Sequence, residues 1–457
     1  MSKALKIYEK ALQLKQEILP SNHSAIARTL NNIGLIYYKQ GEYSKSMDFS
    51  EKALKMYQVT LPLNHIAIAQ TLNNIGSIHS DQGDYSKALE FYEKALKLKQ
   101  ESLPTNHLAI AKTLNNIGLI HNKLGFYSKA LDFNERALQM YQTKLPLNQT
   151  AIAQTINNIG YIYSVQGDYS KSLSFFERAL QLKKETLPPN HPTIAETFNN
   201  IGSIFSNQGN YLKSLDFFER ALKIFQEKLP QNHTSIAQTI DNIGSLYYKQ
   251  GDYSKSLAFH EKALKILDKV IPTNHLAIAK TLNNIGLLYY NQGDLSKALE
   301  YYEKALQMKR AKLPSNHSAI AKTINNIGLI YYKQGDYSKA LECYERALLI
   351  YQNTLPSNHS DIAQTLNNIG SIFSDKGHFS KSLAFYERAL TIFQETLPSN
   401  HSTIANIYHT RDISLFVIRN NTRSPGICPP SGLFSKGSNE TWTLDSLCIS
   451  DTLRMHL

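Results

Sequence analysis

The chain has 457 residues, of which 42% are hydrophobic and 19% are charged, and its formal net charge at pH 7 is +12. This balance excludes an intrinsically disordered chain, because disordered segments hold too few apolar residues to form a packed core. The positive charge is spread along the sequence without a basic run, which predicts a solvated surface with a weak preference for acidic partners.

The first predicted element is an amphipathic helix at the N-terminus. The opening residues lack the apolar run of a signal peptide, and no stretch of about 18 apolar residues occurs in the chain, so we expect a cytoplasmic protein without membrane contact. The run from Ser2 to Leu5 aligns with the run from Ser86 to Leu89, which is the middle of a repeated unit. We therefore expect that this helix lacks its partner and that an upstream portion of the protein precedes it.

A Leu-Pro dipeptide follows this helix and then recurs every 42 residues, from Leu19 to Leu397, with Ile271 replacing leucine once. Self-similarity at a fixed period of this size is typical of stacked repeats, because one unit cannot bury its apolar face alone. Nine complete units without an insertion lie between Leu19 and Leu397. We number them from one to nine.

Each unit contains two predicted helices. Helix A begins after the Leu-Pro turn, carries apolar residues such as Ile26, Leu30 and Ile33 on one face, and ends at a glycine. Helix B follows, with a second apolar face. A glycine in the middle of each helix A (Gly34) and a small residue in each helix B (Ala88 or its equivalent) allow the two helices to approach closely, as an antiparallel hairpin requires.

These residues resemble the tetratricopeptide repeat, whose usual unit of about 34 residues is lengthened here by eight. The Thr-Leu-Asn-Asn-Ile-Gly run of helix A and the Leu-Pro-x-Asn-His turn resemble more specifically the repeats of kinesin light chains. The resemblance covers residues 1–405. It implies an all-α fold, a right-handed superhelical solenoid of antiparallel helix pairs with nine complete units and one leading helix B.

Histidines recur in the Leu-Pro-x-Asn-His turns, at His23, His65, His107, His191, His233, His275, His317, His359 and His401. Stacked units would place them about 10 Å apart, too far to share one metal ion. We expect them to cap the helices that follow. Cys343 replaces an aromatic residue of helix B, and no phosphate-binding loop or nucleophile elbow occurs. We therefore expect no enzyme, no cofactor and no metal site.

The face of helix A opposite its core carries a polar stripe that includes two consecutive asparagines. In arrays that this chain resembles, helix A lines a concave groove and such positions hold peptides. An asparagine amide both donates and accepts, which suits the backbone of an extended peptide. The alternative is that one asparagine of each pair bonds the neighbouring unit. The predicted groove comprises Arg28, Asn31, Asn32, Lys39, Asn73, Lys112, Asn115, Asn157, Asn199, Lys249, Lys280, Asn283, Asn284, Tyr290, Lys322, Asn325, Asn326, Tyr332, Lys333 and Asn367.

Basic residues outnumber acidic ones along this stripe, which favours an acidic peptide. The acidic positions are Glu196, Asp81, Asp375 and Asp241. Units seven and eight combine Lys280, Lys322 and Lys333 with Tyr290 and Tyr332, and we predict the main ligand patch there. The alternative is a set of solvated surface tyrosines.

The repeat pattern stops after Ala405, where a tenth helix A loses the Thr-Leu-Asn-Asn-Ile-Gly run. The remaining residues contain Trp442 and turn-forming runs around Pro425 and Pro429. We predict a solenoid over residues 1–405 and an irregular, poorly ordered tail over residues 406–457. A splice or gene-model origin of the tail is a further hypothesis.

The leading functional hypothesis is a protein interaction scaffold that binds an extended, acidic peptide in the groove, by resemblance a cargo adaptor like the kinesin light chains. Against a light chain proper stands the absence of a heptad region. The second hypothesis is the repeat segment of a larger enzyme or signalling sensor, with a catalytic or nucleotide-binding domain upstream. A third, RNA binding, rests on the net charge alone and predicts salt-sensitive retention on nucleic acid.

Overall fold

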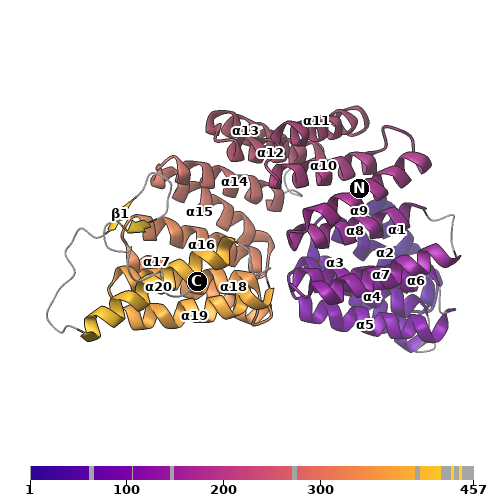
Figure 1. Cartoon of the computed structure of the whole chain (residues 1–457). Helices are drawn as coiled ribbons and strands as arrows, with labels where there is room; N and C mark the ends of the chain where they lie inside the picture. The colour runs from indigo at the N-terminus through magenta and orange to yellow at the C-terminus, as the bar shows by residue number, and fades with distance from the viewer. Residues whose placement is uncertain are drawn as a thin grey trace.

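The computed structural model describes residues 2–60, 66–104, 107–144, 149–269, 275–396, 402–423, 434–436 and 442–444 (Figure 1). The even-numbered helices of the repeat region are the predicted A helices: α2 (Ser24–Lys39), α4 (Ile66–Asp81), α6 (Leu108–Lys123), α8 (Gln149–Val165), α10 (Pro192–Asn207), α12 (Thr234–Lys249), α14 (His275–Asn291), α16 (Ser318–Lys333) and α18 (Ser360–Asp375). The odd-numbered helices are the B helices: α1 (Ser2–Ile18), α3 (Tyr43–Thr60), α5 (Tyr85–Ser102), α7 (Tyr127–Lys144), α9 (Tyr169–Thr186), α11 (Tyr211–Lys228), α13 (Tyr253–Asp268), α15 (Leu295–Lys312), α17 (Tyr337–Thr354) and α19 (Phe379–Thr396). The predicted helix pairs are confirmed: α2 and α3 form unit one, and α18 and α19 form unit nine.

The histidines of the Leu-Pro-x-Asn-His turns cap the A helices, as predicted. The Nδ1 atom of His23 accepts a hydrogen bond from the backbone N–H of Ala25 at 3.1 Å. This satisfies one of the free N–H groups in the first helical turn. The same cap occurs at His107, His191, His233, His317 and His359. His275 differs because it is the first residue of α14, and His65 and His401 lie outside the described residues.

Helices A and B of each unit pack closely through the glycine in the middle of helix A. In unit one the Ser46 hydroxyl donates a hydrogen bond to the Gly34 carbonyl at 2.8 Å. The equivalent serines of four other units, Ser172, Ser214, Ser256 and Ser382, make the same bond to their glycines. The small residue of helix B therefore does more than leave space, since serine also adds a buried hydrogen bond across the hairpin.

The A helices lie on the inner side of the curved stack. Neighbouring A helices contact each other at α2 and α4, at α6 and α8, and along α8, α10, α12 and α14. Side-chain hydrogen bonds also join them: Asn115 Nδ2 donates to Thr155 Oγ1 at 2.7 Å, and Asn199 Nδ2 donates to Thr239 Oγ1 at 2.8 Å. Helices on the inner side of a curve converge. The polar stripe of the A helices, on the face opposite their core, therefore forms the concave surface.

The stack curves until distant units touch. Figure 1 shows α1 to α9 on one side, α14 to α20 on the other, and α10 to α13 joining them. Lys312 Nζ lies 3.3 Å from Glu42 Oε1, and a Cβ atom added to Gly83 would lie 2.7 Å from the His317 ring. Tyr85 of unit two belongs to the same buried cluster as Tyr351 of unit eight. Units one and two therefore contact units seven and eight.

Acidification should loosen this contact at His317. Burial lowers the pKa of His317 from 6.5 to about 4. Because the folded-state pKa lies below the unfolded value, the stabilisation is complete above pH 6.5 and is lost as the pH falls toward 4. We expect the radius of gyration, measured by small-angle X-ray scattering, to increase over this range.

The His317→Asn variant is the control for this expansion, since asparagine can still cap α16 but does not titrate. We expect it to expand less than the wild type between pH 6.5 and 4. The same acid expansion in both proteins would contradict a role for His317.

Three B helices bury a lysine where other units hold Tyr141, Phe225 or Leu267. Lys183 is 1% exposed, and its Nζ donates to Thr197 Oγ1 at 2.8 Å and to the Thr193 carbonyl at 2.9 Å. Burial lowers its pKa to about 8. Lys99 and Lys309 are also buried, donate to the equivalent threonines Thr113 and Thr323, and have a pKa lowered by burial to about 8.

Replacing Lys183 with phenylalanine should raise the unfolding free energy at pH 7 by about 2 kcal/mol, because burial of the ammonium group is costly and the charge that acts on it, Glu196, is exposed. The unfolded state binds more protons than the folded state between pH 8 and 10.5, so wild-type stability rises over that range and the advantage of Lys183→Phe shrinks. Urea unfolding at pH 7 and pH 10 measures both effects. A variant that is less stable at pH 7 would refute this account.

The segment after residue 405 begins with a helix, which corrects the predicted irregular tail over residues 406–423. Helix α20 spans Ser402–Arg423 and packs against α19. Ile404 and Ile407 are buried, and the buried Ser414 lies on the same helical face. The Thr-Leu-Asn-Asn-Ile-Gly run is lost, but this helical spacing persists and covers the last hairpin.

Two short strands, β1 (Phe434–Lys436) and β2 (Trp442–Leu444), pair antiparallel with Phe434 opposite Leu444. The rest of the predicted tail lies outside the described residues. Within the described residues, no helix has the length and apolarity that crossing a bilayer requires.

Candidate functional site

The basic residues predicted for the groove lie on the concave surface and are exposed. These are Arg28, Lys39, Lys112, Lys249, Lys280, Lys322 and Lys333. Two of them also contact neighbouring helices: Lys280 Nζ lies 3.6 Å from Asp241 Oδ2, and Lys249 Nζ donates to Asn207 Oδ1 at 2.6 Å. Lys322 and Lys333 thus leave unit eight with two exposed positive charges.

The first asparagine of each pair points between neighbouring A helices. Asn157 donates to Thr197 and Asn283 donates to Thr323, while Asn31, Asn73 and Asn325 accept from the second asparagine of the next unit. Together with Asn115 and Asn199 these residues hold neighbouring units in register. The hydrogen bonds therefore favour the alternative interpretation for this position, and the peptide contacts of these asparagines stay a prediction.

The second asparagines lie closer to the surface and are half-buried. Among those predicted for the groove, these are Asn32, Asn284 and Asn326. Asn284 donates to Asp241 Oδ2 at 3.0 Å, so part of its hydrogen-bonding capacity is used inside the protein.

The tyrosines predicted to contact a ligand take part in the stack. The Tyr332 hydroxyl donates to Asp375 Oδ2 at 2.7 Å, and burial raises its pKa. The Tyr38 hydroxyl makes the same bond to Asp81 at 2.6 Å. Tyr290 packs against the largest buried cluster. The rings can still offer apolar area, but the hydroxyl of Tyr332 is already paired with the next unit.

Asp241 does not face the groove, although it was predicted to contribute charge there. It is 2% exposed, and its Oδ1 lies 2.7 Å from Nδ1 of His260, which is 1% exposed. Burial alone would raise the pKa of Asp241, but the hydrogen bond from His260 and the charges nearby outweigh it and lower the pKa. His260 replaces the ring that most units hold at this position. The two substitutions in unit six thus form one buried pair, which sequence reasoning missed.

Exposed apolar side chains also lie on the concave surface, where only a polar stripe was predicted. They are Leu35, Leu119, Tyr161, Val165 and Leu287. Leu119 and Tyr161 occupy the same position of neighbouring units three and four. Their spacing of 42 residues is the signal that could have revealed them in the sequence.

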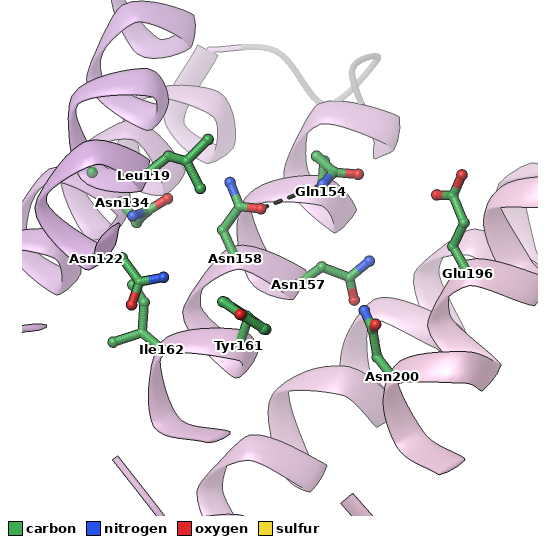
Figure 2. A pocket seen from close by; sticks show the side chains of 11 residues that line it. Leu119, Asn122, Asn134, Gln154, Asn157, Asn158, Tyr161, Ile162, Glu196 and Asn200 are labelled. Atoms are coloured by element: carbon green, nitrogen blue, oxygen red, sulfur yellow. Dashed lines mark hydrogen bonds between the residues drawn. The ribbon is translucent and has the colours of Figure 1, made fainter. Parts of the chain in front are cut away.

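A cavity of about 160 Å³ opens beside Leu119 and Tyr161 (Figure 2). It lies between α6, α7, α8 and α10. Gly118 and Asn134 line its inner end, and Gln154 and Glu196 line its outer side. The sequence signal was Asn134, a small polar residue where most units carry an aromatic ring.

Cys343 packs beside the buried cluster of unit eight, as predicted, and burial raises the pKa of its thiol. Cys428 and Cys448 lie outside the described residues. No cluster of three or more His, Cys, Asp or Glu side chains suited to a metal ion occurs in the described part of the chain.

Comparison with known proteins gives matches at the level of family and fold. The tetratricopeptide repeat family matches residues 1–58, 67–143, 151–227, 235–311 and 319–395. The search of curated proteins finds no significant match.

Three solved structures are similar to this chain, two of them with a TM-score above 0.5. A Rap protein complexed with Competence and Sporulation Factor is 16% identical, covers 82% of this chain and 99% of its own, and has a TM-score of 0.54. The apo form of the quorum sensor NprR from B. thuringiensis is 16% identical, covers 76% of this chain and 93% of its own, and has a TM-score of 0.52. The nearly identical repeats of a putative kinesin light chain from Podospora anserina are 18% identical, cover 46% of this chain and 99% of their own, and have a TM-score of 0.38.

Proposed function

The chain belongs to the tetratricopeptide repeat family, whose fold is typically a non-catalytic scaffold for protein interactions, and we propose that its concave surface binds an extended peptide segment of a partner protein. The supporting observation is the continuous inner face of the A helices. It presents exposed charged and apolar side chains at matching positions of successive units. A surface with one such row per unit suits an extended chain, which offers contacts at regular spacing.

The part of the groove formed by units seven and eight is the proposed site for an acidic segment. Lys322 and Lys333 are exposed on α16, and Lys280 lies on the neighbouring α14. Asn326, which lies between Lys322 and Lys333 in the sequence, is half-buried. Lysine ammonium groups attract carboxylates, and the half-buried amide can bond a peptide backbone. This assignment keeps the patch predicted from the sequence but relies on its lysines rather than on the Tyr332 hydroxyl.

The biological role that we propose is an adaptor in the cytoplasm, similar to the cargo-binding repeats of kinesin light chains. The alternative is the repeat segment of a larger enzyme or signalling sensor. Both roles would use the same concave surface, so a test of that surface bears on both.

Selection of a displayed library of random 16-residue peptides on the purified chain tests the proposal. We expect acidic peptides to be enriched, and we expect the double variant Lys322→Glu/Lys333→Glu to weaken their binding by about tenfold or more, with the loss reduced at high salt.

The control variant is Lys223→Glu/Lys265→Glu, which makes the same charge change on exposed positions of B helices α11 and α13. Lys265 lies in the last turn of its helix, as Lys333 does. Equal weakening by both double variants would show that net charge, and not the concave surface, binds the peptides.

A further inference from the structure

The cavity between units three and four arises because one aromatic ring is missing. In unit two the ring of Tyr92 lies against Gly76, and in unit four the ring of Phe176 lies against Gly160. In unit three the equivalent residue is Asn134, beside Gly118. Its side chain is shorter than a ring, so part of the volume that a ring fills elsewhere stays open to the concave surface.

The buried wall of this cavity carries hydrogen-bond acceptors without donors. The Oδ1 atoms of Asn122, Asn134 and Asn157 are buried and accept no hydrogen bond within the described residues. The three side chains are 8%, 1% and 6% exposed. The Nδ2 group of Asn134 is used by the Ala130 carbonyl at 2.7 Å, and that of Asn157 by Thr197 Oγ1 at 3.3 Å. A buried acceptor without a donor costs about 1–3 kcal/mol. The unpaired oxygen of Asn157 recurs at Asn115, Asn199, Asn283 and Asn367, so the oxygens of Asn122 and Asn134 are the ones that indicate a ligand that donates at this cavity.

The mouth of the cavity differs in chemistry from its wall. Leu119 and Tyr161 are 44% and 47% exposed and form an apolar edge. Glu196, on α10, is exposed at the far side and places a carboxylate near the opening (Figure 2). A ligand group that fits must therefore have an apolar stem for the edge and several N–H donors for the asparagines, and a positive charge on it is attracted by Glu196 at the opening.

Arginine and lysine side chains combine such a stem with a positively charged tip that carries several N–H donors. The volume also fits, since a cavity of about 150 Å³ admits a ligand of the size of benzene. We propose that this cavity receives an arginine or lysine side chain of the bound peptide. This inference rests on the proposed function, because the side chain arrives with a peptide on the concave surface.

The basic anchor and the lysine patch lie at different places along the groove, which gives the peptide a direction. The anchor cavity lies in units three and four, and the lysine patch lies in units seven and eight. Along the inner face, at about 10 Å from one A helix to the next, four units make a curved path of about 40 Å, or about 12 residues of extended chain. The preferred peptide therefore carries a basic residue near one end and acidic residues near the other.

Peptides enriched from the 16-residue library provide the test. We expect them to share one arginine or lysine, and we expect its replacement by alanine to weaken binding to the wild-type chain by about tenfold. In the Asn134→Tyr variant the ring should fill the cavity, and the same alanine replacement should then make little difference. Units seven and eight already carry a tyrosine at this helix B position and a leucine at the position of Leu119. The variant therefore repeats a combination that occurs elsewhere in the chain.

Two further variants keep the test independent of folding defects. Glu196→Gln removes an exposed carboxylate, whose charge also acts on the buried Lys183, and should weaken binding of the basic peptides by about threefold to tenfold. Phe218→Tyr changes the same helix B position in unit five, where Ser203 can pair with the new hydroxyl as Ser77 pairs with Tyr92. We expect Phe218→Tyr to leave peptide binding unchanged.

The outcomes separate the two claims. Two results would contradict the proposed basic anchor and leave the proposed function standing. In the first, the enriched peptides depend on Lys322 and Lys333 but share no basic residue. In the second, they bind Asn134→Tyr and Glu196→Gln as tightly as the wild type. A library that yields no peptide sensitive to the concave surface would overturn both.

Discussion

The His260→Phe variant should lose about 3 to 5 kcal/mol of unfolding free energy, because it leaves the carboxylate of Asp241 buried without its closest partner. Phenylalanine itself fits the position, since Phe176 and Phe218 occupy it in units four and five. The loss therefore measures the unpaired carboxylate rather than a packing defect. Among the described residues, Asn284 and Lys280 would remain in contact with the Asp241 carboxylate.

The double variant Asp241→Asn/His260→Tyr should recover most of this stability. It gives unit six the asparagine and tyrosine that units seven, eight and nine carry at these positions. Urea unfolding of the wild type, the single variants Asp241→Asn and His260→Tyr, and the double variant completes the cycle. Additive losses in the two single variants, with no recovery in the double variant, would mean that the two residues do not act as a pair.

The pH dependence of the same proteins gives a second readout. The pKa of Asp241 is lowered in the folded protein, so its contribution is present above the unfolded pKa of 3.8 and is lost as the pH falls through the folded value. The double variant lacks this titration and should lose less stability than the wild type below pH 4.

The Gly328→Val variant should lose about 3 kcal/mol or more, because valine would separate helices α16 and α17. A Cβ atom at Gly328 would lie 2.7 Å from the ring of Tyr344 and 3.1 Å from Cβ of Cys343. Tyr344 is 1% exposed and packs with Ile369 and Ile372 of the next unit, so its ring cannot move aside without disturbing unit nine.

The matched control is Gly335→Ala, seven residues further along the same hairpin. Gly335 has a φ of +79° and no atom within 4 Å of an added Cβ, so alanine there costs only backbone strain, about 1–2 kcal/mol. Urea unfolding should rank Gly328→Val well below Gly335→Ala in stability. Equal losses would show that the hairpin does not depend on close approach at Gly328.

The features set by local sequence could be predicted. The 42-residue period and the apolar spacing within a unit fix the helix pairs. His23 and its equivalents cap the next helix by accepting from a backbone N–H only two residues further along the chain. Helix α20 shows how a motif can mislead, since the loss of one run suggested an irregular tail while Ile404 and Ile407 kept their helical spacing.

The features set by packing between units could not be predicted. On a helix, neighbouring residues lie about 100° apart, so periodicity alone does not decide which asparagine of a pair meets the next unit and which meets solvent. The Asp241–His260 pair and the Asn134 cavity each join residues of helix A and helix B across a hairpin. The contact of His317 with Gly83 depends on curvature accumulated over several units.

Hydrogen–deuterium exchange with the tightest peptide from the library tests most directly whether the concave surface is the binding site. Slower exchange is expected in the A helices from α6 to α16. These include the segment of α6 around Gly118, which contacts Asn134, and the segment of α16 that contains Lys322. Little change is expected in the B helices at the convex side. Protection confined to the B helices or to α20, with none on the A helices, would contradict the account.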